Sequence, residues 1–357
     1  MIIDMNKPVA VLISDVHYSV HTLSLADAAT KQAITKANEL RVPLIVAGDL
    51  HDTKANLRGE CVNAMINTFK MCGHQPIILV GNHDRLNEKS PEHSLNFLRP
   101  YARIVDNVAY LDELDLYVMA YNHDILALRK RLASMRARGV KNVIMHQGLN
   151  GSNMGDYVKD DTALNKEDVE DFRVISGHYH ARQTIKCRPL PRCIGGSFAA
   201  IQAEHALHNK GIGTFDYIGN PYTLSYGEAN DPPKGFQILK NDNSLEFVPT
   251  NLRRHVIIEM RSDGKAIPYN YTKDDLVWVK VYDTKANLAV LNKTTVGKML
   301  NLEVFKFEQI CTEELQPEKA DLSLKGDKLL DSIIDSLSEV NDNRKAVLKS
   351  TWRQLCE

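Results

Sequence analysis

The chain lacks the features that mark several classes of protein. No uninterrupted apolar run approaches the about 20 residues that a membrane-spanning helix needs, so we expect no membrane association. The first residues, MIIDMNKPVAVLIS, show no basic segment followed by a small-residue cleavage site, which predicts a cytoplasmic protein. Six cysteines are present but none is paired in C-x-x-C spacing, so the sequence suggests neither a zinc ribbon nor a disulfide framework.

An excess of charge of one sign is also missing. The chain has 44 Lys and Arg against 45 Asp and Glu, and its formal net charge is −1. Bulk charge therefore does not indicate a nucleic-acid partner, although a local basic patch or a bound metal can still supply a positive field. At 357 residues, the chain is long enough for one large domain of about 250 residues with smaller modules attached.

Buried-strand patterns alternate with helical patterns along the first 150 residues. Short apolar runs rich in β-branched residues predict strands at 7–14, 42–48 and 75–81, with helices at 24–40 and 56–73 between them. A further helix at 124–139 precedes a strand at 142–146, and the chain becomes richer in strands from residue 172. These patterns predict an α/β fold in which sheets pack between helices.

Polar side chains follow five of the predicted strands. Loops at the carboxyl ends of strands in open α/β sheets converge on one crevice, so we expect these side chains to lie together. They are Asp15 and His17 in ISDVH, Asp49 in AGDLHD, Asn82, His83 and Asp84 in VGNHD, His146 in MHQG, and His178 and His180 in SGHYH.

These residue types suit two neighbouring divalent metal ions. First-row ions accept mixed oxygen and imidazole ligands, and one carboxylate can bridge two ions about 3.5 to 4 Å apart. Residues i and i+2 of a strand share a face, so Asp-x-His and His-x-His can each address one cluster. A lone Asp-x-His is more often solvated loop, but five such motifs in order, each after an apolar strand, predict a two-metal site.

The ordered set D-x-H, GD, GNHD, H and GHxH resembles that of the calcineurin-like metallophosphoesterase superfamily. The resemblance implies an α/β fold, a metallophosphoesterase β-sandwich flanked by helices. It implies two divalent ions, with manganese favoured by analogy and magnesium also open. The ligands that it implies are Asp15, His17, Asp49 and His180 for one ion, and Asp49, Asn82, His146 and His178 for the other, with Asp49 as the bridge.

The resemblance also implies catalytic roles. A water activated by the ions attacks phosphorus in line, and His83 acts as general acid or transition-state stabiliser at the leaving oxygen, with Asp84 orienting its imidazole. Asp52 departs from the pattern, because cellular relatives typically have histidine three places after the bridging aspartate whereas bacteriophage versions share the aspartate. We expect Asp52 to orient a metal-bound water or His83, with solvated loop as the alternative, and His51 to be a bystander on that loop.

Residues 217–240, YIGNPYTLSYGEANDPPKGFQILK, resemble the segment after the last metal motif in SbcD-like nuclease subunits, closest in pattern to bacteriophage versions. This resemblance implies an exonuclease on duplex ends and an endonuclease on single strands, within an ATPase–nuclease complex of DNA recombination, repair and replication. For a phage-encoded chain the compartment would be the host cytoplasm. An ordinary hairpin in a stand-alone metallophosphatase or cyclic-nucleotide phosphodiesterase stays open as the alternative.

The same resemblance implies a domain plan. Residues 1–250 would form the nuclease domain, 251–312 a small α/β domain that caps the active site on DNA, and 313–357 a linker with two amphipathic helices. We expect these helices to dock onto an SbcC-like ATPase, with packing against the parent chain as the alternative. The resemblance further implies a homodimer, formed by helices near 56–72 and 91–99, within a heterotetramer.

Two features stay outside the motif pattern. The apparent insertion at 182–212 has a modest basic density that either meets DNA phosphates or is a solvated loop; its basic residues are Arg182, Lys186, Arg188, Arg192 and Lys210. We expect the remaining histidines to be surface or packing residues; they are His21, His74, His93, His123, His205, His208 and His255.

Overall fold

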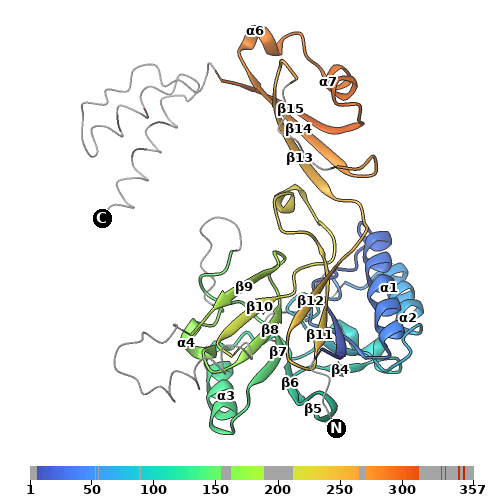
Figure 1. The fold of residues 1–357 in the computed structure, drawn as a ribbon, viewed down its shortest axis with the longest axis vertical. Coiled ribbons are helices and arrows are strands. Elements are labelled where there is room, and N and C mark those ends of the chain that lie inside the picture. Colours follow the sequence, from blue (N-terminus) through green and yellow to red (C-terminus); the bar gives the residue numbers. More distant parts are fainter. Residues whose placement is uncertain are drawn as a thin grey trace. The chain divides into compact units, whose positions relative to one another are not determined.

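The computed structural model describes residues 6–52, 54, 56–87, 90–153, 162–188, 212–264 and 271–312, and the single positions 331, 334, 345 and 349. The chain divides into two compact units, Met1–His255 and Val256–Glu357 (Figure 1). The predicted C-terminal helix pair falls outside the described residues apart from those four positions, as does the part of the basic insertion at 189–211. Within the described residues, no helix is both long and apolar enough to cross a membrane.

The first unit contains a six-stranded sheet with the order β12-β11-β1-β2-β3-β4. The first four strands in the chain pair in parallel, and β11 and β12 add antiparallel strands beyond β1. The strands are β1 (Pro8–Ile13), β2 (Leu44–Val46), β3 (Ile77–Leu79), β4 (Arg103–Val105), β11 (Gly235–Lys240) and β12 (Leu245–Pro249).

A second six-stranded sheet has the order β5-β6-β7-β8-β10-β9. Its four inner strands run parallel, and β5 and β9 close its two edges in antiparallel pairing. The strands are β5 (Val108–Leu111), β6 (Leu116–Met119), β7 (Asn142–His146), β8 (Arg173–Gly177), β9 (Gln183–Lys186) and β10 (Thr214–Tyr217).

The two sheets pack face to face and helices cover their outer faces. One buried cluster joins Leu12 and Ile45 of the first sheet to Val118 and Ile144 of the second. Helices α1 and α2 cover the first sheet, whereas α3 and α4 lie on the opposite side against the second (Figure 1). The predicted β-sandwich flanked by helices is therefore confirmed.

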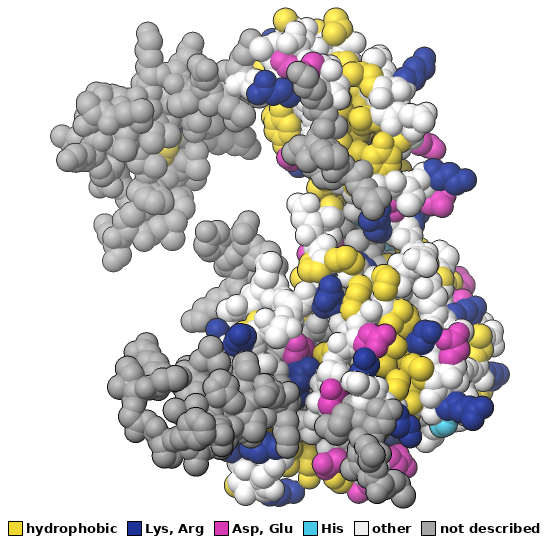
Figure 2. Space-filling view, in the orientation of Figure 1, with side chains coloured by type: hydrophobic (Ala, Val, Ile, Leu, Met, Phe, Trp, Pro, Cys, Tyr) yellow, Lys and Arg dark blue, Asp and Glu magenta, His cyan; other side chains and the backbone are white. Residues whose placement is uncertain are grey.

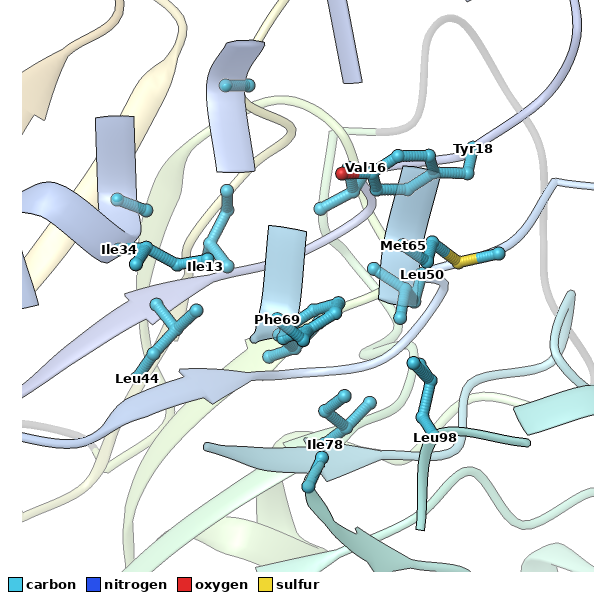
Figure 3. Packing of buried hydrophobic residues seen from close by; sticks show 14 of the residues in the cluster. Ile13, Val16, Tyr18, Ile34, Leu44, Leu50, Met65, Phe69, Ile78 and Leu98 are labelled. Carbon is cyan, nitrogen blue, oxygen red and sulfur yellow. The ribbon is translucent and has the colours of Figure 1, made fainter. Parts of the chain in front are cut away.

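The helical elements of this unit follow the apolar spacing of the sequence. Helix α1 buries a face of small residues, and side chains from α1, α2 and the strands interlock beneath it, among them Ile34, Phe69 and Ile78 (Figure 3). Full burial of each such side chain contributes about 1.5–3 kcal/mol. The elements are α1 (Leu23–Leu40), α2 (Gly59–Phe69), η1 (Ser94–Leu98), η2 (Asp112–Leu114), α3 (Ile125–Ala137), α4 (Lys166–Val169) and η3 (Tyr226–Glu228).

The second unit is a small α/β module. Its sheet has the order β13-β14-β15, and strictly alternating burial along β13 and β14 directs one face, including Val256, Ile258 and Val279, to the core. Leu288 and Val296, from the two helices, cover that face. The elements are β13 (His255–Arg261), β14 (Leu276–Asp283), α6 (Lys285–Leu288), α7 (Lys293–Leu300) and β15 (Val304–Cys311).

Candidate metal centre

The predicted ligands from five separate strand ends converge in the first unit. Three groups of His, Asp and Glu among the described residues have ligand atoms that all lie within 4.8 Å of one another. The groups are Asp15, His17 and His180; Asp49, His146 and His178; and His17, Asp52 and His83. The first two groups correspond to the two ion sites that the motif pattern implies.

Four of these side chains sit on main chain in the left-handed region. The φ angles are 52° at Asp15, 51° at His17, 50° at Asp49 and 91° at His178. Such a conformation costs a non-glycine residue on the order of 1–3 kcal/mol, and it persists only where the surroundings enforce it. Here the loops after β1 and β2 are tied together, because Asp15 N donates to Gly48 O (3.1 Å) and His17 N donates to Asp49 O (3.1 Å).

Gly48, before the predicted bridging aspartate, makes room for a ligand from the other sheet. Its φ is +94°, and a Cβ there would lie 2.2 Å from Nδ1 of His146. Only glycine fits, because any side chain would displace the imidazole and would also strain the main chain. The strand-ending glycine thus brings Asp49 and His146 within reach of one ion.

In the second ligand group, a main-chain hydrogen bond determines which ring nitrogen of His146 is available to bind a metal. Nδ1 of His146 donates to the carbonyl of Ala47 (2.7 Å), which leaves Nε2 facing Asn82 Oδ1 (3.0 Å) and Asp49 Oδ2 (3.2 Å). Nδ1 of His178 lies 2.9 Å from the same Asn82 oxygen. Two imidazoles, an amide oxygen and a carboxylate therefore point at one another, a donor set that suits a first-row divalent ion.

The first ligand group also brings two imidazoles and a carboxylate together. Nε2 of His17 lies 3.1 Å from Nε2 of His180, and a cation between them satisfies both lone pairs. The Asp15 carboxylate is buried beside them and accepts hydrogen bonds from His178 N (3.0 Å) and Ser14 Oγ (2.5 Å). The donor sets of both groups thus fit divalent ions.

In the chain without ions, protons balance the charge of this site. Burial would raise the pKa of Asp49, but His146, His17 and His83 outweigh it and lower the pKa. Burial would lower the pKa of His146, but the charge and hydrogen bond of Asp49 raise it to about 9. A buried carboxylate thus faces an imidazolium, and bound metal ions would replace that proton.

Asp84 does not orient His83 as expected from the resemblance. Its two carboxylate oxygens accept the main-chain N–H of His51 (2.9 Å) and of Gly81 (2.8 Å), and the residue is fully buried. Burial, together with the charge of Asp49, raises the pKa of Asp84 to about 6. The expectation is wrong because Asp84 is committed to main chain: it fastens the loop after β2 to the loop after β3.

The contacts of Asp52 with the histidines of the site differ from the expected one. Its carboxylate lies 3.3 Å from Nδ1 of His17, and this close contact with the imidazole lowers the pKa of Asp52. Its main-chain carbonyl accepts from Nδ1 of His83 (2.7 Å). The expected hydrogen bond to His83 is therefore made by main chain, whereas the side chain orients His17. His51 is fully buried rather than on a solvated loop, and no described metal-binding group includes it.

Glu228 is a contact residue that the motif reasoning missed. Its Oε1 lies 2.7 Å from Nδ1 of His180. Burial would raise its pKa, but His180, Lys234 and Asn220 together lower it to about 2, so the residue is a carboxylate. A signal was present, since Glu228 belongs to the YIGNPYTLSYGEAN stretch, but a lone Glu carries no ligand spacing.

Comparison with known proteins bears on residues 9–182, which match the family model described as calcineurin-like phosphoesterase. All seven predicted ligands and His83 lie within this segment, whereas Glu228 lies beyond it. The family uses divalent metal ions, in agreement with the two ligand groups.

The chain also matches solved structures. One is a 5'-nucleotidase precursor from Thermus thermophilus, at 12% identity and a TM-score of 0.31. The match covers 50% of this chain and 46% of that chain, so the chain spans less than half of the length of that protein. No curated protein matches the chain.

Proposed function

We propose that the chain is a metal-dependent DNA nuclease: an exonuclease on duplex ends and an endonuclease on single strands. The metal-dependent phosphoesterase chemistry rests on the two ligand groups and on the family match. The choice of DNA as substrate rests on residues 217–240, which resemble the corresponding segment of SbcD-like nucleases.

One observation carries this choice. The nuclease-like segment is part of the metal centre and not a distant hairpin, because Asn220 N and Lys234 Nζ both donate to the carbonyl of His180, at 3.2 and 3.1 Å. Tyr222 also donates its hydroxyl to Val16 O (2.5 Å), between Asp15 and His17. The most specific resemblance in the chain therefore falls on residues that shape the site.

Each residue has a defined part in the proposed reaction. Asp15, His17, Asp49 and His180 would hold one ion, and Asp49, Asn82, His146 and His178 the other. When bound, the two ions activate a water and neutralise the charge that develops on the phosphate. His83 stands beside this group with its Nδ1–H on Asp52 O, so its Nε2 is the ring nitrogen that can pass a proton to the leaving oxygen.

On the face shown in Figure 2, the distribution of charge leaves the attraction of DNA to the ions. On the face shown in Figure 2, Lys and Arg side chains are interspersed with Asp and Glu. A surface of mixed sign gives little long-range attraction for a polyanion. We therefore expect DNA binding to weaken when the ions are removed.

The test is incubation of the full chain with Mn²⁺ and end-labelled linear duplex or single-stranded DNA. Cleavage that stops on chelation and is absent from an Asp49→Asn variant is the expected result. A parallel assay uses a phosphomonoester and a cyclic nucleotide. Intact DNA alongside rapid hydrolysis of either compound would replace the proposal with the stand-alone phosphatase or cyclic-nucleotide phosphodiesterase.

We further propose the assembly that the resemblance implies: a homodimer through the region of α2 and η1, joined to two SbcC-like ATPase subunits through residues 313–357. Helix α2 buries Cys61, Met65 and Phe69 against the core and leaves its other side available. Truncation after Lys325 should abolish co-purification with the ATPase and preserve metal-dependent hydrolysis of a simple phosphodiester. Retained co-purification would refute this role of the tail, and light scattering tests the dimer.

A further inference from the structure

Glu228, at the end of η3, is a buried carboxylate with a specific partner on each oxygen. Oε1 accepts from His180 Nδ1 (2.7 Å), and Oε2 accepts from Asn220 Nδ2 (3.0 Å) and from Leu224 N (2.9 Å). Lys234 Nζ lies 3.4 Å from Oε2, and only 13% of the Glu228 side chain is exposed. The carboxylate is therefore held in one orientation before it meets the histidine.

The opposite nitrogen of the same imidazole faces the first ligand group. Nε2 of His180 lies 3.1 Å from Nε2 of His17, in the group that also contains Asp15. An imidazole whose Nδ1–H is held by a carboxylate is confined to the tautomer with a lone pair on Nε2, and it becomes a more basic ligand.

The main chain of His180 is gripped by the same segment. Its carbonyl accepts from Asn220 N (3.2 Å) and Lys234 Nζ (3.1 Å). Gly219, with φ +77°, allows this approach, since a Cβ there would lie 3.0 Å from His180 O and from Arg182 N. The segment is anchored at its far side by Thr223, whose Oγ1 accepts from His255 N (2.8 Å).

We propose that Glu228 is a positioning residue for the first ion, holding His180 so that its Nε2 is presented to Asp15 and His17. A segment beyond residues 9–182 thus completes one of the two ion sites. The inference rests on the metal-binding part of the proposed function and is independent of which phosphoester is cleaved.

The two ion sites differ in the groups that hold their histidine ligands. His180 and His17 of the first group are held by carboxylates, Glu228 and Asp52. His146 of the second group is held by a neutral carbonyl, Ala47 O. Loss of the Glu228 charge should therefore weaken one ion and spare the other.

The experiment titrates the metal-free full chain with Mn²⁺ alone and measures free ion by equilibrium dialysis. In Glu228→Gln, one of two bound ions should weaken about 10- to 100-fold, the usual effect of removing such a partner, while the other keeps its affinity. Glu246→Gln is the matched control, because Glu246 pairs with Lys240 at 2.8 Å on the exposed surface; it should bind both ions normally.

A double-mutant comparison separates positioning from a general structural role. In a His180→Ala background, Glu228→Gln should cause no further loss of affinity, because its target is already gone. Glu228→Asp, which keeps a charge, should lose less affinity than Glu228→Gln, and it replaces that variant in every comparison if Glu228→Gln does not fold.

Normal binding of both ions by the Glu228→Gln variant would overturn the inference. So would a loss of ion affinity on Glu228→Gln in the His180→Ala background that equals the loss in the wild-type background. A wild-type chain that binds two ions but leaves DNA intact would refute the proposed function only. Because binding is measured without substrate, the two failures are distinguishable.

Discussion

Removal of the metal ions should make the stability of the first unit depend on pH in a predictable direction. Without ions, His146 faces Asp49 at 3.2 Å, and its pKa is raised from 6.5 to about 9. A raised pKa in the folded state contributes stability that is fully present below pH 6.5 and is lost as pH rises through about 9. His17 acts in the same direction, because Asp52, Asp49 and Asp15 together outweigh its burial and raise its pKa too.

The size of the effect follows from the interval between the two pKa values. The rise in the pKa of His146 from 6.5 to about 9 corresponds to roughly 3 kcal/mol of folding free energy, at about 1.4 kcal/mol per pH unit. This is a substantial fraction of the 5–15 kcal/mol or so that stabilises an ordinary domain. Bound ions displace the protons, so excess Mn²⁺ should abolish the loss, and metal affinity should itself rise with pH.

The assay is urea unfolding at pH 6.5 and pH 9, with chelator or with Mn²⁺. Trp278 lies in β14 of the second unit, so unfolding of the first unit is followed by another probe. Hydrogen exchange of peptides covering β2 and β7 reports on it directly. His146→Gln should remove most of the pH dependence, whereas the exposed His74→Gln should retain it. A chelated chain that keeps or gains stability up to pH 9 would refute the reasoning.

Three further substitutions test separate parts of the site. Asp49→Asn should abolish activity and weaken both ions in Mn²⁺ titration; loss of one ion alone would exclude a bridge. At Mn²⁺ concentrations that saturate both sites, Asp52→Asn should lower turnover about 10-fold, because it removes the charge facing His17 Nδ1 and keeps the carbonyl that holds His83; unchanged turnover would make Asp52 a bystander. Asp84→Ala leaves two buried N–H groups without an acceptor and should cost about 2–6 kcal/mol in chemical unfolding, against less than about 1 kcal/mol for the exposed Asp106→Ala; equal losses would contradict the anchoring role.

The sequence predicted the elements whose apolar pattern is long or continuous. Strands β1, β2, β3 and β7 and helices α1, α2 and α3 all lie within or within one residue of predicted ranges. The hairpin of β5 and β6 was not predicted, because its strands have four residues each and its turn uses Asp115 at φ 47° in place of a glycine. The three-residue β4 was missed because it lies in YARIVDN, which has no continuous apolar run, whereas the equally short β2 and β3 lie in the apolar runs VPLIVAG and QPIILVG.

The candidate ligands were predictable because their signal is local. Each stands at the end of an apolar strand, and the parallel order of the strands brings those ends together. The partners that orient them were not predictable, because they come from elsewhere in the chain: His146 bonds to Ala47, His180 bonds to Glu228, and His17 lies against Asp52. Asp84 shows the converse, since its position beside His83 in the sequence suggested a contact that the structure replaces with main-chain bonds.

The distribution of these partners explains how strained ligands are held in place. Asp15, His17, Asp49 and His178 all adopt positive φ, a total of roughly 4–12 kcal/mol of unfavourable conformation that no local contact within a single loop can offset. The compensation comes from bonds between loops: Asp84 joins the loops after β2 and β3, His178 N joins the loop after β8 to Asp15, and Glu228 joins the later hairpin to His180. Each strand end is thus held by another strand end, so the geometry of the metal centre depends on the docking of the two sheets. A substitution that loosens the packing between the sheets should therefore also loosen the metal centre.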